Sequence, residues 1–253
     1  MARQVGKFRI TGTIGGLNFY SSDGQDLVRK AGGGFTRDAI KNMPSMEPVR
    51  HNGTEFGNLS TVKRLIRESV ITSLPKLLER KWHSALVSVL TQIKAEDYLS
   101  NHGSRSVKRG LNTVEGMRLL LDFLFTPDQS LDNLLNKLPI AESLGLSYCL
   151  KDFELNKSIF KNEGTHLGLH YFVVDYDINT LTWQSYSAEK ILLSKEHKTT
   201  SQLDFLISNL PPIPDFRLAF LGVALYKTSE EEMIMVNELD LVGLRCVGVF
   251  CGG

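Results

Sequence analysis

The chain has 253 residues, with 29 Lys and Arg against 28 Asp and Glu and a formal net charge of +1. This balance excludes a protein that binds polyanions by its bulk charge, so a nucleic-acid partner would need a local basic patch. The 3 cysteines have no regular spacing, which argues against a disulfide framework. Because the sequence has no secretory signal pattern and no apolar run near the roughly 20 residues of a membrane helix, we expect a cytoplasmic protein, or one within a particle assembled in the cytoplasm, without a membrane partner.

Residues 1–34 predict an N-terminal β-hairpin arm. Strand-type side chains alternate with glycines between Lys7 and Arg29, and Ser21–Gly24 is a turn signal that ends in Asp-Gly. A unit of this size is not stable alone, so its apolar side chains have to pack on another surface. Two hypotheses stay open: the arm packs on its own domain, or it adds a strand to the sheet of a neighbouring subunit.

Residues 35–125 predict a helical region. It starts with a short helix over 36–43, which Pro44 closes, and a polar connection over 45–58.

Three apolar stripes at helical spacing follow this connection. The first covers 62–74, after an N-cap at Ser60 or Thr61. The second covers 82–93 and the third 107–121. We therefore expect three helices in this part of the chain.

Residues 126–253 predict an antiparallel β-domain, because β-branched and aromatic residues dominate and turn signals recur at short intervals. Strands are expected over 169–176, 181–186, 216–226, 233–236 and 239–250. Short strands joined by turns favour a sandwich. The predicted fold class is thus α+β, with an N-terminal β-hairpin, a central helical segment and a C-terminal antiparallel β-sandwich-like domain.

The sequence contains no recognised catalytic or cofactor motif. The glycines of 12–16 lack the lysine of a phosphate-binding loop and do not open a helix. His166 and His170 fall in a strand, where residues four apart are about 13 Å from each other, too far to chelate one ion. Cys246 lies in an apolar strand, as a core cysteine does. We therefore expect a non-enzymatic protein with no catalytic residue, no cofactor and no bound metal.

One basic helix face is a candidate for contacts with phosphate. Lys63, Arg64 and Arg67 lie opposite the apolar stripe of the first long helix. The solvated face of an amphipathic helix has the same composition, and Glu68 dilutes the charge. Nucleic-acid binding is therefore an alternative to the preferred function below.

Three runs in the N-terminal part carry a further pattern: GTIGGLNFYSSDGQDLVRKAGG, MPSMEPVRHNGTEFG and STVKRLIRESV. They combine GTIG, an aromatic pair, a DG turn, an Arg and a GG pair with R-x-N-x-x-E-F-G and a basic helix. In this pattern the chain resembles an uncharacterised protein family common in Bacteroidota genomes. The resemblance is specific over 1–70, looser after Asp122, and departs from the family's pattern over 128–165. It implies the architecture given above and no enzyme activity or substrate.

The preferred hypothesis is a structural or assembly protein. The most patterned residues lie in the glycine-rich hairpin and the segment after it, and pattern in loops indicates contact more than core packing. Such a protein would self-associate, or dock with other assembly proteins into a phage-like, tubular or shell-like particle. The expected assembly contacts are Phe8, Ile10, Ile14, Leu17, Phe19, Tyr20, Arg29, Arg50, Glu55 and Phe56.

A ligand-binding β-sandwich module is a further alternative. Trp183 and Tyr186 are its candidate platform. Residues three apart lie on opposite faces of a regular strand, which weakens this hypothesis.

Overall fold

The structure, a computed structural model, describes most of the chain. The described residues are 2–4, 8–31, 36–79, 82–127, 138–153, 155, 159–160, 164–197, 200–229, 232–236 and 242–252. The chain divides into two compact units, Met1–Arg50 and His51–Gly253. Lys7, at the start of the expected hairpin, and residues 239–241, at the start of the last expected strand, lie outside the described residues.

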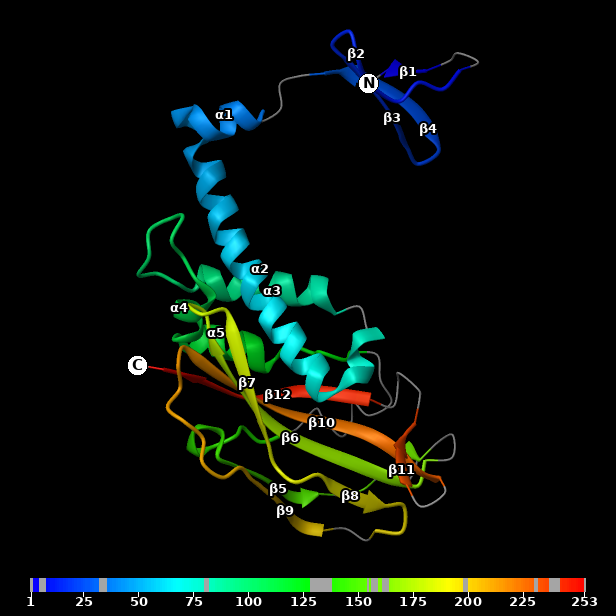
Figure 1. Cartoon of the computed structure of the whole chain (residues 1–253), viewed down its shortest axis with the longest axis vertical. Helices are drawn as coiled ribbons and strands as arrows, with labels where there is room; N and C mark the ends of the chain where they lie inside the picture. Colours follow the sequence, from blue (N-terminus) through cyan, green and yellow to red (C-terminus); the bar gives the residue numbers. More distant parts are fainter. Residues whose placement is uncertain are drawn as a thin grey trace. The chain divides into compact units, whose positions relative to one another are not determined.

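The first unit contains a four-stranded antiparallel sheet in the order β1-β4-β3-β2 (Figure 1). Its elements are β1 (Ala2–Arg3), β2 (Gly12–Ile14), β3 (Leu17–Ser22), β4 (Gln25–Lys30), α1 (Arg37–Asn42) and the 3₁₀ turn η1 (Pro44–Met46). The expected hairpin is present as β3 and β4, and β1 and β2 extend it on either side.

Two tight turns fix the register of this sheet. Gly15 and Gly16, between β2 and β3, have φ of 57° and 78°, and Asp23 and Gly24, between β3 and β4, have φ of 51° and 74°. Positive φ at both central residues is characteristic of the type I′ hairpin turn, whose twist matches that of the strands. Gly-Gly and Asp-Gly adopt it at low cost, so these dipeptides set which side chains share a face.

The short helix α1 forms where the sequence predicts it. Thr36 is its N-cap, because Thr36 Oγ1 accepts a hydrogen bond of 3.1 Å from the backbone N–H of Ala39. The helix ends before Pro44, as expected.

The long helix α2 (Glu47–Ser73) begins earlier than the sequence suggests. The prediction of a connection over 45–58 and of an N-cap at Ser60 or Thr61 is wrong. Pro48 lies in the first turn, where the missing N–H has no helical partner, and the helix accommodates Gly53 and Gly57 in its interior.

The second unit contains most of α2 and the remaining helices. These are the 3₁₀ turn η2 (Pro75–Glu79), α3 (His83–Ala95), α4 (Val107–Leu111), α5 (Val114–Leu121) and the 3₁₀ turn η3 (Ser143–Gly145). The helix expected over 107–121 is two short helices, because Thr113 Oγ1 accepts a 3.0 Å hydrogen bond from the N–H of Gly116 and starts a new helix. Among the described residues, no helix has the length and apolar composition to cross a membrane.

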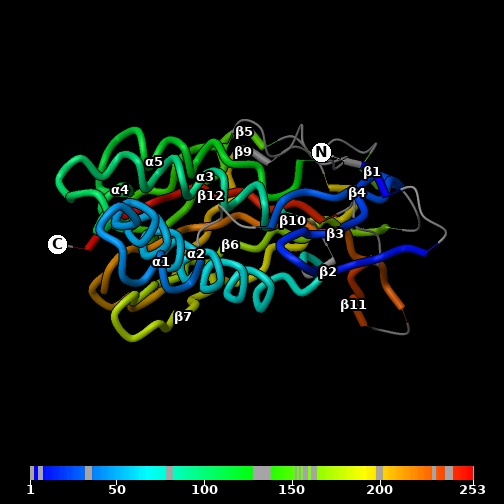
Figure 2. The backbone as a smooth tube through the Cα atoms, turned by 90° about the horizontal axis from the view of Figure 1, so that it is seen from above, coloured from blue at the N-terminus to red at the C-terminus, as the bar shows by residue number. Residues whose placement is uncertain are grey.

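A six-stranded antiparallel sheet forms the centre of the second unit. Its strands are β6 (His166–Asp177), β7 (Thr182–Ser187), β8 (Ile191–Ser194), β10 (Phe216–Ser229), β11 (Glu232–Met235) and β12 (Val242–Cys251). β12, β10, β6 and β7 lie side by side in that order (Figure 2). A second sheet pairs β5 (Ser147–Phe153) with β9 (Thr200–Leu206).

The six-stranded sheet has a different cover on each face (Figure 1). Phe172 and Val174 of β6 point to the helices, and Tyr171 and Val173 point to β5 and β9, as the period of two in a strand requires. Tyr148 of β5 stacks on Tyr171 with ring centroids 5.1 Å apart. Two antiparallel sheets thus face each other, and the α+β class predicted from sequence is confirmed.

Helices and strands of the second unit share one core. Leu65 of α2, Leu90 of α3 and Leu244 of β12 belong to the same buried cluster. The expected boundary at 125/126 therefore does not separate two cores, and the boundary between compact units lies after Arg50, not at 34/35.

Candidate functional site

Strand register sorts the side chains of the N-terminal sheet onto two faces. Leu17 pairs with Ile14 and Lys30, and Phe19 pairs with Val28. Paired residues point to the same face, and neighbours in sequence point to opposite faces. One face, called the apolar face below, carries Ile14, Leu17, Phe19 and Val28. The opposite face carries Thr13, Asn18, Tyr20, Leu27 and Arg29.

The apolar face is not buried. Ile14 is 59% and Leu17 is 41% exposed, and Phe19 and Val28 are only partly buried. None of the described residues of Met1–Arg50 falls in the buried class, and α1 buries no residue of its own. A sheet normally buries one face against another layer, and the described residues of the first unit supply no such layer for this face.

The β2 edge of the sheet is unprotected. All three residues of Gly12–Ile14 are exposed, and among the described strands β2 pairs with β3 alone. Natural edge strands are commonly blocked by charged residues or proline, and 10–14 contains neither. The outer backbone groups of β2 can therefore accept another strand.

Polar groups flank the apolar face and cover the opposite one. Asp26, at one end of the apolar face, accepts a hydrogen bond from Ser21 and forms a 3.0 Å ion pair with Arg9. On the opposite face, the Arg29 guanidinium lies 5.3 Å from the centroid of the Tyr20 ring. The expected contacts Tyr20 and Arg29 thus lie on a different face from Phe19.

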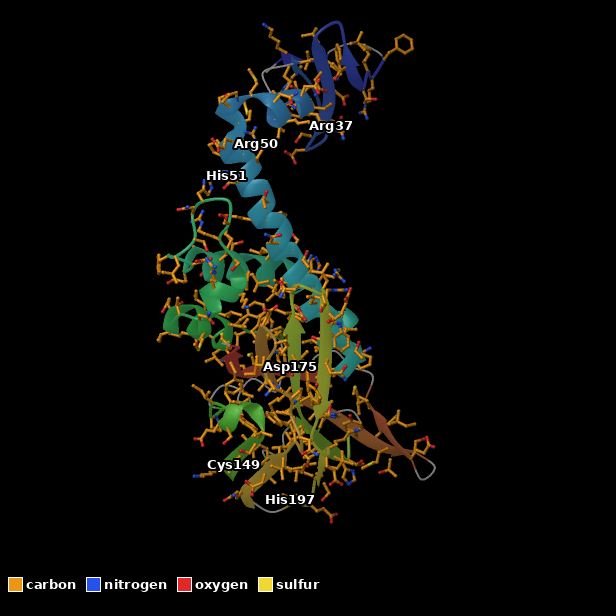
Figure 3. All side chains as sticks on the ribbon, turned by 60° about the vertical axis from the view of Figure 1, so that its left-hand side comes forward. Arg37, Arg50, His51, Cys149, Asp175 and His197 are labelled. Carbon is orange, nitrogen blue, oxygen red and sulfur yellow. The ribbon has the colours of Figure 1, made fainter. Side chains whose placement is uncertain are left out.

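The remaining expected contacts of the first unit lie outside the strands. Phe8 is 85% and Ile10 is 41% exposed. Arg50, next to His51 on α2 (Figure 3), donates hydrogen bonds from Nη1 to the carbonyl oxygens of Ile40 and Met43, at 2.7 and 3.0 Å. These carbonyls lie at the end of α1, so Arg50 caps that helix.

The prediction that Glu55 is an assembly contact is wrong, because Glu55 is 0% exposed. Its Oε2 lies 2.5 Å from Lys94 Nζ, and its Oε1 accepts hydrogen bonds from Arg105 Nε at 3.0 Å and the Gly103 N–H at 2.7 Å. Burial raises the pKa of Glu55, but the hydrogen bonds from Lys94 and Arg105 outweigh it and lower this pKa to about 2. Glu55 thus joins α2, α3 and the loop after α3, whereas Phe56 is 57% exposed.

The three expected phosphate contacts gather around one surface depression. Lys63, Arg64 and Arg67 line it with His83 of α3, and its volume is about 470 Å³. Arg64 forms a 3.2 Å ion pair with Glu68. No ion pair within the described part of the chain engages Lys63 or Arg67.

The two strand histidines lie on β6, as expected. His170 Nε2 is 2.7 Å from the Tyr226 hydroxyl oxygen. Burial, together with the charge of Lys190, lowers the pKa of His170 to about 4. No group of three or more His, Cys, Asp or Glu side chains in the described segments could hold a metal ion.

Two further expectations from the β-domain are confirmed. Trp183 packs with the helix-facing cluster and Tyr186 with the β5–β9 cluster, so they lie on opposite faces of β7. Cys246 is a core residue, 2% exposed.

The sequence analysis did not predict one buried ion pair in the second unit. Arg217 Nε and Nη2 lie 2.5 and 2.8 Å from the two carboxylate oxygens of Asp175, and these residues are 2% and 4% exposed. Asp175 lies on β6 among the strands of the second unit (Figure 3). The available signal was a charged residue inside each of two apolar runs, FRLAFLGVAL and YFVVDY.

The best candidate for a functional surface is the N-terminal sheet, with its apolar face and its open β2 edge. No protein-family model, no curated protein and no solved structure matches the chain. The function proposed for the chain therefore rests on strand register, on the exposure of side chains and on their charge.

Proposed function

We propose that the chain is a non-enzymatic structural or assembly protein that self-associates through its N-terminal sheet. The observation that carries the proposal is the apolar face, Ile14, Leu17, Phe19 and Val28, in a unit without a buried described residue. Fully burying a side chain such as Leu17 or Phe19 contributes about 1.5–3 kcal/mol. A partner that covers this face therefore gains substantial binding free energy.

A second copy of the chain is the partner that this face fits. The apolar face ends in Lys30 on one side and Asp26 on the other. A two-fold axis through its centre brings each Lys30 toward the partner's Asp26, while the apolar side chains pack as in a β-sandwich. The Asp26–Arg9 pair does not prevent this contact, because Arg9 is 80% exposed and such pairs are weak.

The β2 edge supplies a second contact, of a different kind. Two copies of Gly12–Ile14 can pair antiparallel and join two sheets into one. When contacts through the apolar face alternate with contacts through the β2 edge, the assembly does not stop at a dimer. It extends into a larger assembly. A tubular or shell-like particle, such as a phage-like one, is an assembly of this type.

Light scattering on size-separated full-length protein over a range of concentrations tests the proposal. We expect a mass above that of one chain, and Leu17→Lys is expected to shift it toward the single chain. Asn18→Lys is the matched control, because it adds the same charge to the same strand on the opposite face, and it is expected to leave the mass unchanged.

Two results would overturn the proposal: a single-chain mass at every concentration, or equal behaviour of the two lysine variants. Circular dichroism and thermal unfolding check that both variants fold. A chain that starts at Thr36 keeps the core of the second unit and is expected to be monomeric.

A nucleic-acid-binding function is a second candidate. The observation that favours it is the depression in which Lys63 and Arg67 lie without an ion-pair partner in the described residues. Its test is given in the Discussion.

A further inference from the structure

A pocket of about 590 Å³ lies in the second unit between α5, segment 138–140 and the outer edge of β12. Its walls are mainly apolar, with Met117, Leu121, Leu138, Ile140, Val247 and Val249 among the lining residues. The N–H of Ala141 donates a 2.6 Å hydrogen bond to the carbonyl oxygen of Val247, which ties this wall to β12. The volume falls in the range of small-molecule sites, about 300–1,000 Å³.

One charged nitrogen in this pocket has no hydrogen-bond partner among the described residues. Arg245 lines the pocket and is partly exposed, but its Nη1 atom is buried and donates no hydrogen bond within the described part of the chain. A guanidinium stays protonated in proteins, and a buried charge is normally paired. Arg217, the other arginine inside an apolar strand, follows this rule through its two contacts with Asp175.

The second arginine that lines the pocket, Arg118, forms ion pairs with two carboxylates. Arg118 lies 2.5 Å from Glu115 Oε1 and 2.8 Å from Asp122 Oδ2. Arg118 thus has two carboxylate partners, whereas Arg245 Nη1 has none among the residues that the structure describes.

A neighbouring pocket also contains a buried polar group without a partner among the described residues, but this group is neutral. The buried Tyr148 hydroxyl likewise has no hydrogen-bond partner in the described part of the chain, and Tyr148 lines a pocket that shares segment 138–140. An unpaired neutral hydroxyl costs less than an unpaired buried charge, so Arg245 decides where an anion binds.

We propose that the pocket beside Arg245 binds a small amphipathic carboxylate. The guanidinium fork matches the two oxygens of a carboxylate, and the apolar walls accept a hydrocarbon chain. A singly charged carboxylate also meets less repulsion from Asp122, which lines the pocket, than a doubly charged phosphate would. This site is independent of the N-terminal sheet and adds a ligand to the assembly role proposed above.

Titration calorimetry of the full chain with decanoate, below its micelle concentration, tests the site. Decanol has the same chain without the charge, and acetate has the same head group without the chain. We expect saturable decanoate binding, affinity for decanol lower by about tenfold or more, and no saturation with acetate, because a hydrogen bond to a charged group is worth about one to two powers of ten in affinity. Equal affinity for decanoate and decanol, or no decanoate binding, would overturn the proposal.

Variants identify the group that holds the anion. Arg245→Met is expected to weaken decanoate binding about tenfold or more, whereas Lys195→Met, which removes an exposed positive charge outside the pocket, is the control and is expected to change it less than about twofold. Ile140→Trp, at a residue 63% exposed on the pocket wall, is expected to block binding and does not depend on the folding of the Arg245 variant. Unchanged binding in Ile140→Trp, or in folded Arg245→Met, would assign decanoate to another place.

Discussion

Glu55 of α2 and Lys94 of α3 meet at 2.5 Å, between Glu55 Oε2 and Lys94 Nζ, where the carboxylate has no exposed surface. Arg105 and the Gly103 N–H occupy the other carboxylate oxygen. One acid therefore holds two helices and a loop together, and its removal leaves two cations without a counter-charge.

Glu55→Gln is expected to lower the free energy of unfolding by about 3 kcal/mol, because a neutral amide leaves Lys94 and Arg105 uncompensated. Urea denaturation followed by circular dichroism measures the change. Glu68→Gln on the same helix is the control: its side chain is 44% exposed, and the expected loss is below about 1 kcal/mol. Equal losses in the two variants would contradict this role of Glu55.

The same carboxyl group is expected to make stability depend on acid pH. Its pKa is about 2 in the folded chain and 4.5 without the fold. Between these values the unfolded chain takes up a proton that the folded chain does not, so the contribution is full above pH 4.5 and is lost as pH falls toward 2. Unfolding free energies measured across this window should fall less steeply in Glu55→Gln. An identical decline in both proteins would show that other groups cause it.

Gly110→Ala is expected to destabilise the second unit strongly. A Cβ at Gly110 would lie 1.8 Å from the backbone carbonyl oxygen of Ile93, and backbone atoms cannot move aside as a flexible side chain can. We expect a loss of about 2–4 kcal/mol in the free energy of unfolding, measured by urea denaturation.

Gly57→Ala is the matched control for this substitution. Gly57 also lies in a helix, but a Cβ there meets nothing within 4 Å. Alanine is the better helix former, so this variant is expected to gain about 0.5–1 kcal/mol. A change of the same sign in both variants would refute the close approach of α4 to α3.

His170→Gln is expected to remove part of the pH dependence of stability between pH 6.5 and 4. The pKa of His170 is about 4 in the folded chain against 6.5 for a free histidine. The unfolded chain therefore gains a proton first as pH falls from 6.5 toward 4, and stability drops by at most about 3 kcal/mol over that window. Thermal unfolding across this range measures the slope in both proteins. The exposed His83→Gln serves as the control, and a slope that changes equally in both variants would argue against His170.

The combined variant Lys63→Glu and Arg67→Glu is expected to lose salt-dependent DNA binding, if that binding uses the basic depression. Each phosphate contact contributes about −0.9 to the slope of log affinity against log salt, so two lost contacts reduce the slope by about 2. Fluorescence anisotropy with a short duplex measures it. Lys151→Glu with Lys195→Glu makes the same charge change elsewhere and should bind as the wild type does. No binding by the wild type at low salt would remove the nucleic-acid alternative.

Local signals in the sequence predicted the parts of the fold that depend on neighbouring residues. The turn between β6 and β7 forms because Asp177 Oδ1 accepts hydrogen bonds from the N–H groups of Asn179 and Thr180, at 2.8 and 3.0 Å. The Asp23–Gly24 turn and the Thr36 cap are of the same kind. By contrast, Pro48 and two glycines suggested a loop where α2 runs on, because tertiary packing overrides weak propensities.

Contacts between distant residues left no such signal. The partners of Glu55 lie 39, 48 and 50 positions away, and nothing near Glu55 in the sequence distinguishes it from an exposed helical glutamate. Of the apolar face, the predicted contacts included Ile14, Leu17 and Phe19 but not Val28, because the assignment of residues to faces depends on the strand register, which the sequence did not specify.

The order in which the core is synthesised has a consequence in the cell. Leu59 and Leu65 of α2 pack in one cluster with Val242 and Leu244 of β12, near the far end of the chain. A ribosome adds about 5–20 residues per second, so the apolar side chains of α2 are synthesised on the order of ten seconds before β12, the last strand that they contact. During that interval the apolar side chains of α2 lack their β12 contacts, so the nascent polypeptide exposes hydrophobic surface that is prone to aggregation.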